Sequence, residues 1–194
     1  LANNDDGSCG YISGCTDSIA LNYDATATCD DGSCAYSLAI GLTYQGGIIF
    51  WLDGNGGGLI AAPSDQSSGA EWGCYGTAIS GADGTGIGTG NQNTIDIENG
   101  CSTTGIAADI CANLTIGGYS DWFLPSKDEL NEMYLNIGQG NTLGLGNIGG
   151  FNYYYYWSST EYGNGNAWSQ GFTIGDQYND FKDNYFTVRA VRAF

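Results

Sequence analysis

The side chains that most often perform chemistry are unevenly represented in this chain. It contains no histidine, which excludes Ser–His and Cys–His nucleophilic catalysis and histidine-ligated metal sites. It contains seven cysteines, and no two of them form a C-x-x-C pair of the kind that binds zinc. The remaining candidates are thiols that form disulfides and carboxylates that bind hard cations. We therefore expect a binding or structural protein and not an enzyme.

The first cysteines indicate a small unit held together by disulfides. Four of the seven fall within the first 34 residues, a density typical of secreted domains in an oxidising compartment. Cys15 and Cys34 are expected to pair, because the unit is too small to bury a core. Cys9 either pairs with Cys29 or has its partner in a segment upstream.

The later cysteines suggest a second bridge. Cys111 lies in the helix-like stretch 105–114, where a small buried thiol is the expected role. Cys74 and Cys101 are then left to pair across a glycine-rich loop.

Carboxylates near the N-terminus allow two interpretations. Asp17, Asp24, Asp30 and Asp31 could supply oxygen ligands to Ca²⁺. Their spacing does not match the D-x-[DN]-x-[DN]-G calcium loop, so they are equally interpreted as solvated turn residues.

The net charge of the chain limits the classes of molecule that it is expected to bind. The 21 carboxylates and four cationic side chains give a formal charge of −17. Such a surface repels phosphate backbones and anionic lipids, so we expect no nucleic-acid binding. No run of 18 apolar residues occurs, so no membrane insertion is expected.

Two domains are predicted. The motif DDGSCGY at 5–11 recurs as DDGSCAY at 30–36, so residues 1–36 comprise one partial and one complete unit of a repeat. This segment resembles the short cysteine- and aspartate-rich repeats of large bacterial surface proteins and would act as a stalk. The chain is expected to be a fragment or processed product of something longer. Residues 37–194 form the second domain. Aromatic residues make up 13% of the whole chain, which favours a packed core in this domain.

The second domain is predicted to be α+β. A strand at 47–52 turns at 53–56 and returns at 59–62, and residues 73–93 form a loop. Helices are expected at 102–114 and after Ser126, where Ser126 and Glu129 form a capping box. Strands follow at 153–159, 167–174 and 185–194, and the last is expected to pair with 47–52. The expected core consists of Trp122, Leu124, Leu130, Trp157, Trp168 and Phe172.

Four segments resemble one family. GGIIF (46–50), DWFLPSKDEL (121–130), YWSSTE (156–161) and VRAVRAF (188–194) are similar to C-terminal adhesin domains with a C-type-lectin-like fold, related to formylglycine-generating-enzyme-like domains. The resemblance implies two helices and a twisted antiparallel sheet with long loops. Neither the Glu-Pro-Asn nor the Trp-Asn-Asp motif of sugar-binding lectins is present, and no cysteine follows Cys111. Calcium-dependent sugar binding and sulfatase-activating oxidase chemistry are therefore not implied.

The last segment is more similar still to the variable proteins of diversity-generating retroelements. There, mutation of template adenines changes chosen codons, and such codons do not encode Trp, Gln, Lys, Glu or Met. Between residues 162 and 187 these types occur only at Trp168, Gln170, Gln177 and Lys182. The alternative is an undiversified loop region rich in Asn, Tyr and Gly.

The resemblance implies a ligand-binding face of adaptable polar and aromatic side chains. The implied contact residues are Tyr162, Asn164, Asn166, Ser169, Thr173, Asp176, Tyr178, Asn179, Asp180, Phe181, Asp183, Asn184 and Tyr185. They are expected to lie largely on one exposed surface, with Trp168, Gln170 and Phe172 facing the opposite way from Ser169, Gly171 and Thr173.

The expected function is that of an extracellular adhesin at the tip of a bacterial surface protein or phage tail fibre. Its partner would be a protein or glycan on the surface of a host or another cell. The chain would belong to a longer protein or a larger assembly, which could be a homo-oligomer. The alternative is a structural subunit of an extracellular filament or virion. Beyond Ca²⁺ no cofactor is expected.

Overall fold

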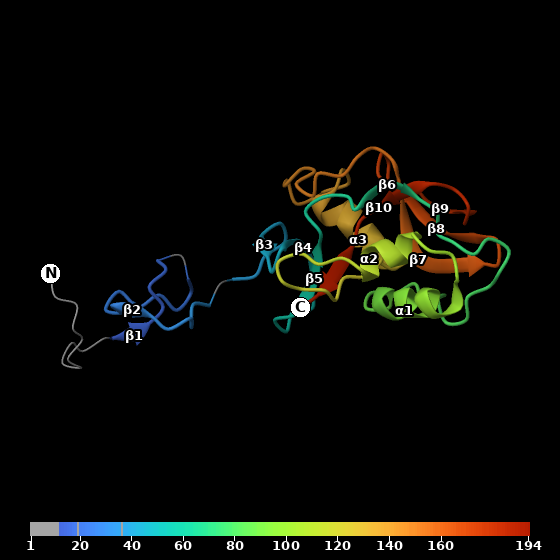
Figure 1. The fold of residues 1–194 in the computed structure, drawn as a ribbon. Helices are drawn as coiled ribbons and strands as arrows, with labels where there is room; N and C mark the ends of the chain where they lie inside the picture. The colour runs from blue at the N-terminus through green and yellow to red at the C-terminus, as the bar shows by residue number, and fades with distance from the viewer. Residues whose placement is uncertain (1–11, 19, 36) are drawn as a thin grey trace. The chain divides into compact units, whose positions relative to one another are not determined.

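The computed structural model describes residues 12–18, 20–35 and 37–194. Contacts divide the chain into two compact units, Leu1–Leu38 and Ala39–Phe194, and each is described by itself (Figure 1).

The first unit is small and joined by a disulfide. Short strands β1 (Ser13–Gly14) and β2 (Cys29–Asp30) pair in parallel, and Cys15, which is buried, is bonded to Cys34 as expected. Cys29 carries an exposed free thiol, which gives no support to a Cys9–Cys29 bridge; Cys9 lies outside the described residues.

The first sheet of the second unit has the order β11-β5-β4-β3. Its hairpin joins β4 (Gly47–Leu52) and β5 (Gly58–Ala61) as the sequence predicts, with β3 (Thr43–Tyr44) on the other edge of β4. Strand β11 (Val191–Ala193) pairs with β5, so the expected pairing of the last strand with 47–52 is wrong. Both edges of β4 are already occupied, and β5 offers the free edge.

The second sheet has five strands in the order β6-β10-β7-β8-β9. These are β6 (Ser67–Ala70), β7 (Tyr155–Gly163), β8 (Asn166–Gly171), β9 (Gln177–Phe181) and β10 (Phe186–Val188), and all neighbours are antiparallel except β7 and β10. The single strand expected at 185–194 is therefore divided between two sheets. Arg189, at the division, is buried and donates hydrogen bonds to the carbonyl oxygens of Ala62 and Gly149.

Three helices lie in the second unit, one more than expected. Helix α3 (Lys127–Ile137) begins with the predicted capping box of Ser126 and Glu129. Helix α2 (Ala107–Ala112) is shorter than the predicted 102–114, and α1 (Gly90–Gly100) begins inside the segment expected to be loop. Among the residues described, no helix has the length and apolar character needed to cross a membrane.

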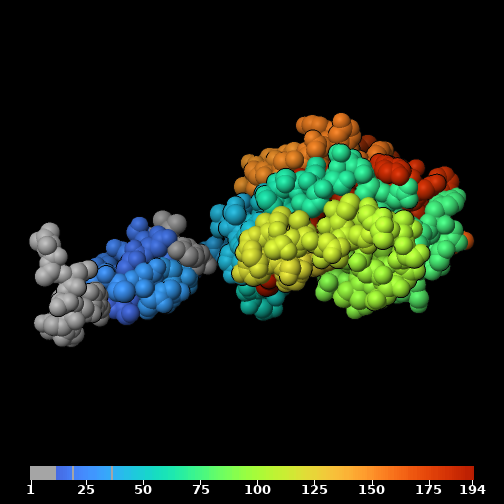
Figure 2. Space-filling model, in the orientation of Figure 1, coloured from blue at the N-terminus to red at the C-terminus, as the bar shows by residue number. Residues whose placement is uncertain are grey.

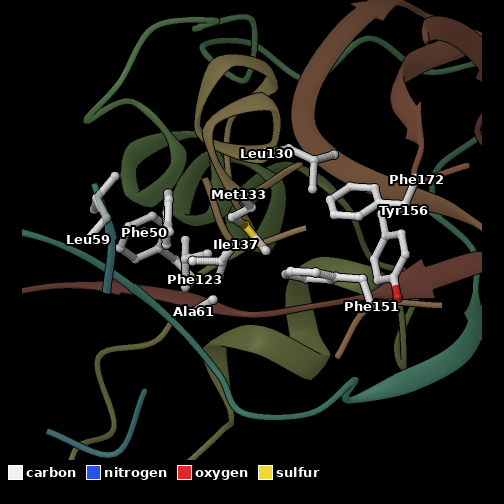
Figure 3. Close-up of a cluster of buried hydrophobic side chains, with 11 residues drawn as sticks. Phe50, Leu59, Ala61, Phe123, Leu130, Met133, Ile137, Phe151, Tyr156 and Phe172 are labelled. Atoms are coloured by element: carbon white, nitrogen blue, oxygen red, sulfur yellow. The ribbon is translucent and has the colours of Figure 1, made fainter. Parts of the chain in front are cut away.

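The core joins the two sheets through α3. Figure 3 shows Met133 and Ile137 of α3 lying between Phe50 and Leu59 of the first sheet and Phe151, Tyr156 and Phe172 beside the second. Trp122, Leu124, Leu130, Trp157 and Phe172 are buried as predicted. Trp168 is only half-buried, so its assignment to the core is wrong.

Cys111 is buried and free, and Cys74 is bonded to Cys101, both as predicted. On the side seen in Figure 2, the green to yellow middle of the chain covers the lower part of the second unit, and teal, orange and red segments lie above it.

Candidate ligand-binding face

A row of aromatic rings crosses one face of the second sheet. Successive members are Tyr178 of β9, Tyr155 of β7, Phe186 of β10 and Trp157 of β7, which we call the aromatic row. Their ring centroids are 6.0, 5.3 and 4.6 Å apart in that order. Trp157 is fully buried and anchored by its indole N–H, which donates to the Ala70 carbonyl. Tyr155 and Tyr178 remain 43% and 45% exposed, so the row has a fixed end and an open end.

Strand alternation and one glycine explain the row. Residues 155 and 157 face the same way along β7, because alternate residues of a strand share a face. Between Tyr155 and Tyr178 lies β8, which presents Gly171 opposite Tyr155. A Cβ at Gly171 would lie 3.3 Å from the Tyr155 ring, so the missing side chain lets that ring extend over β8 toward Tyr178.

A shallow hollow adjoins the row. It has a volume of about 270 Å³ and is lined by Ser68, Tyr154, Tyr155, Tyr185, Phe186 and Thr187. Tyr154 and Tyr185 are among the most exposed aromatic side chains of the described residues, at 65% and 67%. This size suits one side chain of a partner better than a whole small-molecule ligand, because pockets for such ligands usually exceed about 300 Å³.

Carboxylates border both ends of this surface. The Tyr178 hydroxyl donates to Asp176 Oδ2 at 2.9 Å, and the Tyr185 hydroxyl donates to Glu71 Oε1 at 2.7 Å. Each hydrogen bond raises the pKa of its tyrosine, because the phenol proton is held by a carboxylate. Asp180 lies on the same face and accepts a hydrogen bond from Ser169. The phenols therefore stay neutral, and the charge on this surface is negative.

The cationic side chains of the chain are all occupied elsewhere. Lys182 is buried, pairs with Glu161 and donates to the Thr77 carbonyl. The other two buried cations, Arg189 and Arg192, pair with Asp65 and Asp121.

Lys127, the fourth cation, is half-buried. Its Nζ lies 3.6 Å from the centroid of the Trp168 ring. The sequence contains no further lysine or arginine, so no side-chain cation remains to attract an anion to the aromatic row.

A second aromatic group lies on the opposite side of β8 and β9. Trp168 contacts Tyr162 edge to face at 5.5 Å, and Phe181 contacts Tyr75 at 6.1 Å. Phe181 points away from Tyr178 because the two are three residues apart along β9.

The sequence-predicted contact residues are mostly accessible, but they do not share one face. Tyr162, Asn164, Thr173, Asp176, Tyr178, Asn179, Phe181, Asp183 and Tyr185 are exposed, and Asn166, Asp180 and Asn184 are half-buried. Because successive residues of a strand point to opposite faces, Asn179 and Phe181 lie on one side of β9 and Tyr178 and Asp180 on the other. The expectation of a single surface is wrong for this strand.

Ser169 is the clearest exception among the predicted contact residues. It is buried, and its hydroxyl donates to Asp180, so it supports the surface from within. Within β8, Trp168 and Gln170 face the opposite way from Ser169 and Gly171, as predicted, although Gln170 and Gly171 are both buried.

Sequence reasoning missed the centre of this surface. Tyr154 and Tyr155 line the hollow but were not among the predicted contacts. The run of four tyrosines at 153–156 gives no sign of which rings are exposed, because both faces carry the same residue. The register of β7 decides which of these rings are exposed, because it buries Tyr156 against Phe151 and Phe172.

The calcium interpretation of the N-terminal aspartates is not supported by their geometry. Within residues 12–18, 20–35 and 37–194, no group of three or more Asp, Glu, His or Cys side chains is arranged to hold a metal. Asp24, Asp30 and Asp31 instead accept hydrogen bonds from the backbone N–H two residues onward. Asp17 is not gathered with them into such a group. These contacts are typical of turn aspartates.

Comparison with known proteins gives a family and a fold. The model of the Lcl C-terminal domain family matches residues 63–192, from just before β6 to β11. The match confirms the family resemblance inferred from the sequence. No curated protein matches the chain.

Among solved structures, a fimbrial protein from Bacteroides ovatus is similar, with a TM-score of 0.57 and 14% sequence identity. The alignment covers 88% of this chain and 50% of the fimbrial protein, so the chain spans about half its length. At this identity the likeness concerns the fold alone, which is α+β with largely antiparallel sheets.

Proposed function

The chain belongs to the Lcl C-terminal domain family, and from this premise we propose that it is the ligand-binding, adhesin-type module of an extracellular surface protein. The partner is a macromolecule of a cell surface. The binding surface is formed by the aromatic row, the adjoining hollow and those exposed residues of β8 to β10 that share the face of the row.

One observation carries this proposal. Tyr154, Tyr155, Tyr178 and Tyr185 are all exposed and lie together on strands, or next to strands, of one sheet. Folded proteins rarely leave adjacent large aromatic side chains in water unless the patch is used for recognition. Tyrosine suits that role, since it offers a large rigid area and a polar tip at low cost in conformational entropy.

The remaining features agree with an extracellular, non-enzymatic module. Two disulfides, one in each unit, favour an oxidising compartment. The lack of histidine removes the most frequent general base. We infer a C-type-lectin-like fold from the combination of the family match with a two-sheet α+β unit.

We also propose that this face is diversifiable. Nine of the thirteen sequence-predicted positions are exposed, which supports changes there at little cost to the core. Sequencing of the neighbouring DNA tests this directly. A reverse transcriptase gene next to an imperfect copy of the codons for the C-terminal strands is expected, and a neighbourhood without either contradicts it.

Binding to intact cells tests the proposed function. Labelled protein is incubated with a panel of bacterial and animal cells, and bound label is measured by flow cytometry. Saturable binding to at least one cell type is expected, and the double variant Tyr154→Ala/Tyr185→Ala should lose most of it.

The matched control is Tyr75→Ala/Phe181→Ala, which removes two comparably exposed rings from the opposite side of the sheet. This control should bind as the wild type does. Equal loss in both double variants contradicts the assignment of the face. Spontaneous assembly of the wild type into filaments, without cell binding, favours the structural-subunit alternative.

A further inference from the structure

The charge distribution limits what the aromatic row can bind. Lys182, Arg189 and Arg192 are at most 8% exposed, and Lys127 lies against Trp168. The whole chain carries a formal charge of −17. A sulfated, phosphorylated or carboxylated ligand would therefore meet repulsion and find no cationic side chain to pair with.

Three carboxylates lie beside the row. Glu71 stands at the Tyr185 end, and Asp176 and Asp180 stand at the Tyr178 end. An ionised carboxylate accepts hydrogen bonds and donates none. The phenol protons of Tyr178 and Tyr185 are already donated to these carboxylates, so at these two places a ligand meets acceptors.

The rings add a second requirement. The Tyr155 and Tyr178 side chains are 43% and 45% exposed, and the negative face of an aromatic ring attracts a cation within about 6 Å. A guanidinium group meets both conditions, because it is planar, always charged, and carries five N–H donors without an acceptor. The neighbouring hollow of about 270 Å³ has room for a side chain of that kind.

We propose that the aromatic row and its hollow bind an arginine-containing, positively charged segment of a protein partner. A guanidinium group lies against the Tyr155 and Tyr178 rings, whose planes are inclined at 66° to each other, and donates to Asp176, and a second cationic side chain lies near Glu71. This inference rests on the proposed function and assigns the chemical class of its ligand.

Isothermal titration with a defined peptide tests the proposal. The probe is a short peptide of alternating arginine and glycine, and its counterpart contains citrulline, which keeps the shape of arginine and removes the charge. Titrations are done at physiological ionic strength, where attraction between exposed charges is screened beyond about 8 Å. The arginine peptide is expected to bind, and the citrulline peptide is expected not to bind.

Variants separate ring stacking from general attraction to an acidic protein. Tyr155→Leu/Tyr178→Leu keeps the net charge and should weaken binding about five- to thirtyfold, as expected for two lost cation–π contacts. Tyr155→Phe/Tyr178→Phe keeps both rings and should bind within about threefold of the wild type. Circular dichroism of the leucine variant shows whether its loss of binding is a folding defect.

A charge-matched pair completes the design. Asp176→Asn should weaken binding more than Asp83→Asn, which makes the same charge change at an exposed residue of the loop before α1. Equal effects of these two variants, equal binding of the citrulline peptide, or absence of arginine-peptide binding would overturn the inference.

Failure of the inference and failure of the proposed function give different results. Cell binding that depends on Tyr154 and Tyr185, with no binding of the arginine peptide, overturns the ligand class and leaves the adhesin proposal standing. Cell binding that is absent or indifferent to those tyrosines overturns the adhesin proposal.

Discussion

At the scale of single residues, the same side-chain type has different roles according to its place in the sheet. Tyr156 is buried in the core, whereas Tyr155, one position earlier, belongs to the exposed surface. Trp157 is buried and Trp168 is half-buried, although both were predicted to be core. Side-chain type alone therefore does not separate scaffold from contact residues.

Substitution of the two tryptophans tests this distinction. Trp157→Ala should lower the free energy of unfolding by about 3–5 kcal/mol, since it removes a fully buried ring and its hydrogen bond to the Ala70 carbonyl. Trp168→Ala, the matched control, should cost less than half as much. Urea denaturation followed by circular dichroism measures both, and equal losses would contradict the assigned burial.

Arg189 gives a second prediction at this scale. Its guanidinium is 1% exposed and pairs with Asp65 at 2.6 Å. Asp65→Ala leaves that charge buried and without its counter-ion, so a loss of about 3–5 kcal/mol in unfolding free energy is expected. Asp176→Ala, at an exposed carboxylate, should change stability by less than about 0.5 kcal/mol. A similar small effect of both substitutions in urea denaturation would refute the structural role of Asp65.

At the scale of elements, the sequence predicts best where local chemistry is strong. The β4–β5 hairpin and the capping box of α3 agree with the structure because turn residues and cap residues act within a few positions. Helix α1 was missed, since its sequence GNQNTIDIENG is rich in poor helix formers and has no side-chain cap. Packing stabilises it, with Asn93 and Ile97 buried.

Tertiary pairing explains the other errors. The division of residues 185–194 between two sheets depends on buried contacts of Arg189 with segments more than a hundred positions upstream, as well as with Gly149. Strand β9 is polar and short, and only its pairing with β8 identifies it as a strand. The candidate site was found in outline, because its composition is distinctive, but its centre at Tyr154 and Tyr155 depends on register.

The contact of α1 with α2 predicts a dependence of stability on pH. Glu98 is exposed, but desolvation by its neighbours, and then the hydrogen bond and negative charge of Asp109, raise its pKa from 4.5 to about 7. The folded state therefore holds this proton more tightly than the unfolded state. The stabilisation is complete below pH 4.5 and is lost as the pH rises to about 7.

Glu98→Gln should remove the loss of stability that the wild type shows as the pH rises to about 7. Melting temperatures of the wild type and the variant, measured from pH 4 to 8, should diverge in favour of the variant as the pH approaches 7. A temperature difference that is constant across this range would show that Glu98 has no raised pKa.

At the scale of the whole molecule, two units with different sources of stability are joined in one chain. The first has a disulfide and little buried apolar surface, whereas the second has a core that spans both of its sheets. The second unit keeps its scaffold residues in the core and presents exposed residues from β7 to β10, which is the organisation expected of a binding module with changeable contacts.

Reduction should act unequally on the two units. Loss of a disulfide from a small unit costs about 2–5 kcal/mol, which is as much stability as the first unit is expected to have. Hydrogen exchange under reductant should show lost protection in residues 20–35 and largely retained protection in β4, β5 and α3. Equal loss in both units would contradict the division.

The central claim is that the exposed C-terminal positions determine binding and that the fold tolerates their replacement. It is tested most directly with a displayed library in which Tyr154, Thr173, Asp176, Tyr178, Asp183 and Tyr185 are randomised together. Each member is scored for protease resistance and for binding to the cells that the wild type recognises. We predict that most members resist protease and that almost none of these bind. A library in which few members remain resistant, or in which resistant members bind as the wild type does, would contradict the account.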